Sequence, residues 1–379
     1  MLRIELLVGL DDAYGRAVAR GVIRYAKAKA EWKLYGYGRL LADPRELESG
    51  GSPRPDGIIA RAESPAEARE LARLGLPVVD VAGAYVGAGL REANNDDFEA
   101  GRRAGEYLRA LGFKRFAFCG VEGTAWSRLR LRGFAEAAGI AERALPRFER
   151  PLAWWRERPR GTDELASWLG SVPVPTALFA CNDVAGLKVA ETCRGAGFAV
   201  PADIAVLGVD DEDLLCELAD PSLSSVRLDC EGIGMAAAAM LDAALGGQLS
   251  APRARLVSPL SVVERESTRV VVSDDPLVAA AATWIRANAQ LGLGAADLVA
   301  ALPASRRSIE KRFRAATGAT IREAIEEARL DRAKRLLAAS ELPLDSVAEA
   351  SGFGSLQRFH FVFKTREGVS PGAWRRAGR

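Results

Sequence analysis

The chain has 379 residues, of which 49 % are hydrophobic and 27 % charged, and its formal net charge is +2 at pH 7. This length predicts two or three domains with substantial cores, and no apolar run approaches the ~18–20 residues of a membrane span. The N-terminus lacks the basic, apolar and small-residue succession of a signal peptide, so we expect a cytoplasmic protein. Five scattered cysteines without a CxxC motif, and a single histidine, argue against a disulfide framework or a metal site. We expect no cofactor.

Strand and helix patterns alternate through most of the chain. The predicted strands are 4–10, 32–38, 56–60, 77–81, 115–119, 176–180, 204–208 and 223–228, and the predicted helices are 14–30, 66–74, 98–111, 127–138, 184–196 and 231–245, before an extended tail at 255–266. Because helices separate successive strands, we expect parallel sheets with right-handed crossovers. The pattern restarts after Gly112, which predicts two sheets and therefore two lobes.

Polar residues cluster after the predicted strands, where ligands of open parallel sheets bind. The candidates for a shared cleft between the lobes are Asp12, Tyr14, Arg16, Trp126, Arg128, Arg130, Asn182, Asp183 and Asp210. Carboxylate, amide and guanidinium groups satisfy hydroxyls that both donate and accept, and an aromatic ring covers the apolar side of a sugar ring. We therefore expect a small polyhydroxylated ligand. Helix capping by the Asn182–Asp183 pair, an acidic helix start after Asp210, and solvated arginines remain alternative explanations.

The C-terminal part is basic and carries two helix-turn-helix patterns. Residues 276–379 hold 17 Lys and Arg against 10 Asp and Glu, whereas residues 1–275 hold 35 against 40. The second pattern places Val347 on an apolar first helix, Gly352 at the turn and Ser355 at the start of the next helix. The first pattern repeats this plan from residue 296, with Ser305 as the cap, and a helix over 322–339 joins the two.

The outward residues of the two second helices are our candidates for DNA contacts. They are Arg306, Arg307, Glu310, Lys311 and Arg314 in the first unit, and Ser355, Gln357, Arg358, Phe361 and Lys364 in the second. Arginine favours guanine, glutamine favours adenine, and Phe361 suits a thymine methyl group. Arg312, Arg314 and Lys364 are expected at phosphates. The alternative is a pair of ordinary amphipathic hairpins with solvated basic faces.

Two parts of the chain resemble known families. The Arg329–Leu337 helix and the closing Gly-x-Ser-Pro-x-x-Trp-Arg pattern at 368–375 resemble the AraC/XylS-family DNA-binding domain. Segments 112–120, 125–134, 180–187 and 200–211 resemble a LacI/GalR-type sugar sensor, which has the fold of periplasmic sugar-binding proteins. A sensor placed ahead of an AraC-type reader resembles the XylR-like regulators over essentially the whole chain.

The resemblance implies a fold and a function. The expected fold is a two-lobed α/β periplasmic-binding-protein-like (type I) domain at 1–268, a linker at 269–275 and an all-α double helix-turn-helix domain at 276–379. It implies a transcription regulator, as a homodimeric activator that meets double-stranded DNA and RNA polymerase, controlled by a small sugar such as xylose or another aldose. Arg128 and Arg130 match the family's sugar-binding arginine equally well, Asp183 and Asp210 match its carboxylates, and Asp96–Asp97 departs from its usual Asp-Asn.

Three rival functions remain open at this stage. One is a DNA-binding regulator that responds to a non-sugar ligand or to none, and another is a sugar-binding protein without DNA function. Catalysis is disfavoured because the sole histidine, His360, lies in the reader, and neither GxGxxG after a strand nor a P-loop occurs. A glycosidase-type carboxylate pair stays possible on spacing alone.

Overall fold

The computed structural model describes residues 1–29, 31–36, 54–62, 64–83, 89–157, 163–248, 252–270, 273 and 275–377. They form two compact units, Met1–Arg269 and Val270–Arg379, and each is described here by itself. Residues 30 and 37–38 of two predicted elements, and residues 271, 272 and 274 of the predicted linker, lie outside the described residues. Among the described residues, no helix is both long and apolar enough to cross a membrane.

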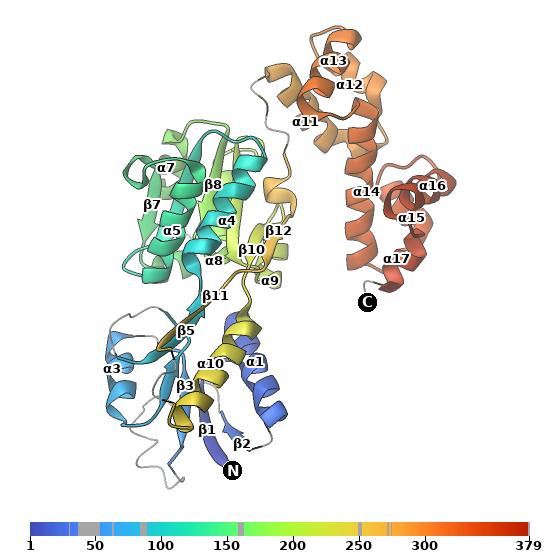
Figure 1. Cartoon of the computed structure of the whole chain (residues 1–379). Helices are drawn as coiled ribbons and strands as arrows, with labels where there is room; N and C mark the ends of the chain where they lie inside the picture. The colour runs from blue at the N-terminus through green and yellow to red at the C-terminus, as the bar shows by residue number, and fades with distance from the viewer. Residues whose placement is uncertain are drawn as a thin grey trace. The chain divides into compact units, whose positions relative to one another are not determined.

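The first lobe of unit 1 is a six-stranded parallel sheet (Figure 1). In the order β11-β5-β4-β3-β1-β2, its strands are Ala254–Val257, Arg91–Asn95, Val78–Asp80, Gly57–Ala60, Leu2–Leu7 and Trp32–Tyr35. Helices α1 (Ala13–Lys29) and α10 (Cys230–Leu245) lie side by side, and α3 (Pro65–Arg73) follows β3. The α1–α10 pair packs so closely that a Cβ on Gly21 would lie 2.1 Å from the Glu231 carbonyl oxygen, and glycine avoids this clash.

The second lobe repeats this plan with one antiparallel pair. In the order β12-β10-β9-β8-β6-β7, its strands are Ser261–Val263, Ser224–Arg227, Ile204–Asp210, Thr176–Ala180, Phe116–Val121 and Arg147–Arg150, and only β10–β12 pair antiparallel. Its helices are α4 (Asp97–Ala110), α5 (Ala125–Ala138), α6 (Leu152–Arg156), α7 (Asp163–Ser171), α8 (Asp183–Gly195) and α9 (Asp213–Leu218), with short 3-10 turns η1 (Glu142–Ala144) and η2 (Glu266–Thr268). The predicted two-lobed parallel fold is confirmed.

Several elements differ from the sequence-based prediction. Strands β5 and β7 and helices α6, α7 and α9 were not predicted. For β5, the reason is that its polar sequence Arg91–Asn95 lacks the β-branched and aromatic residues typical of strands. The predicted extended tail at 255–266 divides into β11 of the first lobe and β12 of the second. The strand predicted at 4–10 is in fact Leu2–Leu7, because residues 8–12 form the turn into α1.

Helices α4 and α5 approach each other at backbone distance. A Cβ on Gly101 would lie 1.9 Å from the Arg130 carbonyl oxygen, and one on Gly133 would lie 1.9 Å from the Phe98 carbonyl oxygen. Only glycine permits this approach, since real Cβ atoms do not come so near another atom. The close packing brings the side chain of Arg130 on α5 to the first residue of α4, Asp97.

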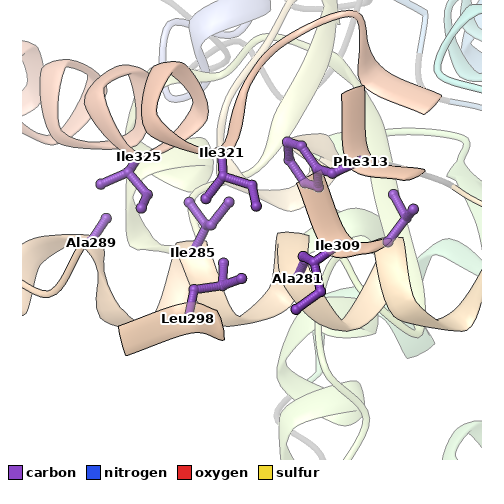
Figure 2. Packing of buried hydrophobic residues seen from close by; sticks show 9 residues of the cluster. Ala281, Ile285, Ala289, Leu298, Ile309, Phe313, Ile321 and Ile325 are labelled. Carbon is purple, nitrogen blue, oxygen red and sulfur yellow. The ribbon is translucent and has the colours of Figure 1, made fainter. Parts of the chain in front are cut away.

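The described residues of unit 2 form helices and the turns that join them. Its elements are α11 (Pro276–Asn288), η3 (Ala289–Leu291), α12 (Ala295–Ala301), α13 (Arg306–Thr317), α14 (Ile321–Ala339), α15 (Leu344–Ala350), α16 (Leu356–Glu367) and α17 (Pro371–Ala377). Figure 2 shows the core of its first half, in which Ile309 and Phe313 of α13 pack with Ile285 of α11 and Ile325 of α14. Helix α11, which was not predicted, supplies one side of this core.

The second half of unit 2 packs around α14, α15 and α16. Its buried residues are Leu330, Ala333, Leu337, Val347, Ala348, Phe353, Phe359, Val362 and Phe363. The turn residue Gly352 has φ +80°, and a Cβ there would lie 2.2 Å from the Ala289 carbonyl oxygen. At the start of α16, Leu356 is 39 % exposed, whereas Val362 in the same helix is buried.

Candidate ligand site and nucleic-acid interface

Arg130 is the centre of a polar cluster in unit 1. Its guanidinium donates from Nε to Oδ1 of Asp97 (2.8 Å) and from Nη1 to the Cys181 carbonyl oxygen (2.6 Å) and Oδ1 of Asp210 (3.4 Å). The residue is only 4 % exposed. No residue that the structure describes accepts a hydrogen bond from Nη2 of Arg130, so this nitrogen keeps donor capacity for a ligand.

Asp210 ends β9 and faces Arg130. Desolvation between the lobes raises the pKa of Asp210 to about 6, although the charge of Arg130 opposes the rise. Its side chain keeps part of its surface accessible and its backbone has a left-handed φ of +112°. A carboxylate held in this way can accept hydrogen bonds from a hydroxylated ligand.

The first lobe contributes Asp12, Tyr14 and Arg61. Oδ1 of Asp12 accepts from the Gly15 amide at the start of α1 (2.7 Å), while Oδ2 accepts from Nη1 of Arg61 (2.5 Å). The Arg61 guanidinium lies 4.8 Å from the centroid of the Tyr14 ring, and the Tyr14 hydroxyl donates to the Val81 carbonyl oxygen. Burial and neighbouring charges raise the pKa of Tyr14 well above its usual value.

The two lobes face each other through these groups. Burial is the main cause of the raised pKa of Tyr14, and the charge of Asp97 on the second lobe adds to it. Burial acts to lower the pKa of Arg61, but the charge and hydrogen bond of Asp12, with smaller contributions from Tyr14 and Asp210, raise it overall. The Ala13 amide also donates to Oε2 of Glu212 (3.2 Å) across the lobes. We call the following residues the interlobe cluster: Asp12, Tyr14, Arg61, Asp97, Trp126, Arg130 and Asp210.

Trp126 belongs to this cluster, whereas two predicted arginines do not. The Arg130 guanidinium lies 5.1 Å from the Trp126 ring centroid. Arg128 is exposed and lines a cavity of about 300 Å³ beside Glu142, Arg147 and Glu149, away from the cluster. Arg16 is exposed and donates to the Asp11 carbonyl oxygen (3.0 Å). Of the two equally matched arginines, the structure thus brings Arg130 to the other candidates and leaves Arg128 outside.

Asn182 and Asp183, at the start of α8, hydrogen-bond to other protein groups near the site. Oδ1 of Asn182 accepts from the Ala185 amide (2.9 Å), which is the helix-capping alternative considered from the sequence. Asp183 is 1 % exposed, and its oxygens accept from the Ser225 hydroxyl (2.6 Å) and the Glu212 amide (2.8 Å). The Asp183 carboxylate therefore holds the loop after β9, and its expected ligand contact stays a prediction.

Two residues of the interlobe cluster were not among the predicted ligand contacts. Arg61 directly follows β3, so the rule that selected residues after strands applies to it as well. From the sequence, Asp97 was noted only as part of a pair that departs from the family's Asp-Asn, and its partner Arg130 is distant in sequence. Only the α4–α5 packing at Gly101 and Gly133 brings this pair together.

All ten predicted DNA contacts in unit 2 are exposed. On α13, Ser305 caps the helix by accepting from the Ser308 amide (3.3 Å), and burial of Ile309 and Phe313 turns the opposite face to solvent. That outer face carries Arg306, Arg307, Glu310, Lys311 and Arg314. Arg306 and Glu310 form an exposed ion pair (2.8 Å). Arg312, expected at phosphate, instead pairs with Asp275 at the start of α11.

Helix α16 has the same organisation. Ser355 accepts from the Arg358 amide (3.2 Å), and the buried Phe359 and Phe363 leave Gln357, Arg358, Phe361 and Lys364 outside. The Phe361 side chain is 72 % exposed, so its ring is accessible to a partner. His360 is half-buried, and its ring lies 6.0 Å from that of Phe359.

The ends of both outward helices come near the start of α14. Hydrogen bonds with Thr320 lower the pKa of Glu323, and the charges of Arg366 on α16 and Arg314 on α13 lower it further. The Arg358 guanidinium also pairs with Oε1 of Glu326 on α14 (2.7 Å). Both helices therefore present basic side chains around the first half of one long helix.

Known proteins resemble both unit 1 and unit 2 of this chain. Residues 106–268 match the periplasmic binding protein-like domain family, and residues 298–377 match a helix-turn-helix domain family. The Xylose operon regulatory protein of Escherichia coli is 29 % identical over 98 % of this chain and 96 % of its own length. The protein of that name from Haemophilus influenzae is 28 % identical over 98 % of both chains. A solved structure of the xylose-binding transcription activator xylR aligns with a TM-score of 0.75 at 28 % identity, covering 99 % of this chain and 98 % of that one.

The chain is similar to XylR-like transcription regulators over nearly its whole length. In this XylR-like regulator, unit 1 carries the periplasmic-binding-protein-like fold and unit 2 the helix-turn-helix domain. The predicted order, with the sensor-type domain ahead of the AraC-type reader, is confirmed. The relatives are transcription regulators, not enzymes.

Proposed function

We propose that this protein is a sequence-specific DNA-binding transcription regulator controlled by a small sugar at the interlobe cluster. The observation that carries this proposal is the convergence of Arg61 with Asp12 from one lobe and Arg130 with Asp210 from the other. Donors and acceptors alternate there, as neighbouring sugar hydroxyls require, and Trp126 supplies an aromatic surface. We propose no catalytic role; incubation with sugars and analysis for products tests that point.

We propose an aldose such as xylose as the effector, because the relatives named above are regulators of a xylose operon or bind xylose. Isothermal calorimetry of the full chain against D-xylose, L-arabinose, D-ribose, D-glucose and D-galactose tests this. Binding by one pentose, lost in Arg130→Met and retained in Arg128→Met, is the expected result. Silence of the whole panel would favour the rival in which a non-sugar ligand, or none, controls the regulator.

We propose that α13 and α16 of each protomer enter successive major-groove segments of duplex DNA, about one helical turn (~34 Å) apart. The support is that both helices bury one face and expose basic and amide side chains on the other. Selection from a random DNA library, followed by salt-dependent gel shifts, tests this. A shift that is independent of sequence, or no shift at all, contradicts it.

Regulation would follow from differential binding to two arrangements of the lobes. We propose that the sugar binds the closed arrangement better, with a coupling free energy typical of allosteric proteins, ~1–3 kcal/mol. The protein would act in the cytoplasm, where DNA lies, as a homodimer that activates transcription by contact with RNA polymerase. Small-angle scattering with and without sugar tests closure, and an unchanged envelope at saturation argues against it.

A further inference from the structure

The loop after β9 contains the strained backbone of unit 1. Asp210 has φ +112° and Asp211 has φ +54°, and they are the non-glycine residues with positive φ in the described part of the chain. Left-handed conformations of this kind are strained for residues with a side chain and persist only where the surroundings hold them. Asp210 belongs to the interlobe cluster, so whatever holds this loop also aims that carboxylate.

The carboxylate of Asp211 is held by two arginines. Oδ1 accepts from Nη2 of Arg265 (2.8 Å) and Oδ2 accepts from Nε of Arg227 (2.6 Å), while the Asp211 amide donates to the Ser225 hydroxyl (3.0 Å). The Asp211 side chain is 5 % exposed. That of Arg265 is 14 % exposed and that of Arg227 is 49 % exposed. Charge pairs that water screens less are stronger, so Arg265 dominates in holding the loop.

Arg265 also fixes the last segment of unit 1. Its amide donates to the Ser224 hydroxyl (2.8 Å), and its Nη1 donates to the Leu223 carbonyl oxygen (3.0 Å). Directly after it, the Ser267 hydroxyl donates to the Val206 carbonyl oxygen (2.6 Å). Unit 1 ends at Arg269, and the chain continues into the helix-turn-helix unit. One side chain thus joins the loop that carries Asp210 to the exit of the sensor.

Helix α4 makes a second connection between the same two places. Asp97 at its start pairs with Arg130, and Tyr107 near its end shares a hydrogen bond with the Thr268 hydroxyl (2.8 Å). Ten residues of helix span about 15 Å as a rigid rod. A shift of Asp97 on ligand binding would therefore reach Thr268, close to Arg265 in the chain.

We propose that Arg265 is a positioning residue: through Asp211 it holds Asp210 for the ligand, and it couples occupancy of the interlobe cluster to residues 264–269, which lead to the DNA-binding unit. The inference rests on the proposed function. A ligand that engages Asp210 pulls on the strained pair 210–211, and the Asp211–Arg265 ion pair passes the displacement to the exit segment.

The test compares Arg265→Met with Arg227→Met in the full chain, because both variants remove one partner of the same carboxylate. Affinity for D-xylose is measured by calorimetry. DNA affinity with and without D-xylose is measured by fluorescence anisotropy on a duplex selected by the wild-type protein. For Arg265→Met we expect sugar affinity to fall about tenfold, and the effect of sugar on DNA affinity, of order 5–150-fold for typical coupling, to vanish. DNA affinity without sugar, and every property of Arg227→Met, should stay within about twofold of wild type.

A readout without ligand separates this inference from the proposed function. Hydrogen exchange of the Asp211, Glu212 and Ser267 amides should accelerate about tenfold in Arg265→Met. The β6 amides of Arg265→Met, and all of these amides in Arg227→Met, should exchange at the wild-type rate. If the wild type binds no aldose, the proposed function fails, and exchange alone decides the inference. Arg265→Lys, which keeps the charge but not the fork that reaches Asp211 and Leu223 together, replaces Arg265→Met if that variant does not fold. Wild-type exchange and a wild-type sugar response in the Arg265 variant would overturn the proposal.

Discussion

Nε of Arg130 donates to Oδ1 of Asp97 over 2.8 Å, and their side chains are only 5 % and 9 % exposed. Removing one partner of such a pair leaves a buried charge without compensation. The pair also joins α5 to α4 beside Asp210, so it fixes the geometry of the interlobe cluster as well as the packing of the lobe.

Arg130→Met should abolish sugar binding and lower the free energy of unfolding by about 3–5 kcal/mol. Arg128→Met changes an exposed residue two positions away. It should leave sugar binding intact and change the free energy of unfolding by at most about 0.5 kcal/mol. Chemical denaturation and calorimetry measure the two effects. Equal loss of sugar binding in both variants would show that the ligand lies elsewhere.

Sugar affinity should depend on pH through Asp210, whose pKa is raised to about 6. The ionised carboxylate accepts hydrogen bonds from hydroxyls more strongly, so affinity should be full above pH 7 and fall about tenfold by pH 5. Asp210→Asn should bind more weakly at pH 7.5 and show a flat profile between pH 5 and 7.5. Calorimetry at several pH values measures this; an unchanged slope in the variant would assign the titration to another group.

The same raised pKa has a consequence for stability without ligand. The pKa of the Asp210 carboxyl is higher in the folded protein than in the unfolded chain. The stability that this carboxyl contributes is therefore present at low pH, where it is protonated, and is lost as pH rises through about 6. Asp210→Asn should therefore stabilise the free protein at pH 7.5, by about 1 kcal/mol after allowance for its partial exposure. Thermal unfolding at pH 5 and pH 7.5 tests it, with the gain confined to the higher pH.

Base reading and phosphate binding should separate in unit 2. Gln357→Ala should lower affinity for the selected DNA by about 1–3 kcal/mol and relax the preference at one base pair. Arg314→Ala should weaken binding to all sequences alike and reduce the salt slope by about 1. Gel shifts over a salt series with single-base variants of the site distinguish the two. Loss of specificity in Arg314→Ala would reverse the assigned roles.

Glu326 should restrain DNA binding. Its Oε1 pairs with Arg358 of α16 (2.7 Å) and with Arg322 (3.4 Å), so Arg358 must leave this carboxylate to reach a base or phosphate. Glu326→Gln should raise DNA affinity, while exposed pairs of this kind cost at most about 1 kcal/mol of stability when broken. Anisotropy measures the affinity. A loss of affinity would mean that Glu326 holds Arg358 in its binding position.

Gly352 should tolerate no side chain. Alanine there would carry φ +80° and a Cβ 2.2 Å from the Ala289 carbonyl oxygen, so Gly352→Ala should cost about 2–4 kcal/mol of stability. Gly354→Ala, two residues later, meets no atom within 4 Å and should change stability by less than about 0.5 kcal/mol. Denaturant unfolding of the full chain, followed by a signal from unit 2, measures both. Equal costs would contradict the close packing of the turn.

The sequence by itself determined the alternation of strands and helices, the two lobes and the paired helix-turn-helix units. These depend on local signals: hydrophobic period, glycine at left-handed helix ends such as Gly318 and Gly368, and side-chain caps such as Ser305 and Ser355. Polar strands such as β5 were not predicted from the sequence, because pairing and burial by neighbouring elements, and not their own composition, make them strands.

Only the tertiary structure decided which polar residues form a site. Arg128 and Arg130 have similar neighbours in the sequence, yet two residues on a helix turn the side chain through about 200°, so one faces solvent and the other Asp97. The sequence did not show that the Asp183 oxygens accept from Ser225 and Glu212, which lie far along the chain. Arg265 joined the site only through Asp211. Pairings between segments this distant in sequence depend on how helices and sheets pack, and no local pattern encodes that distance.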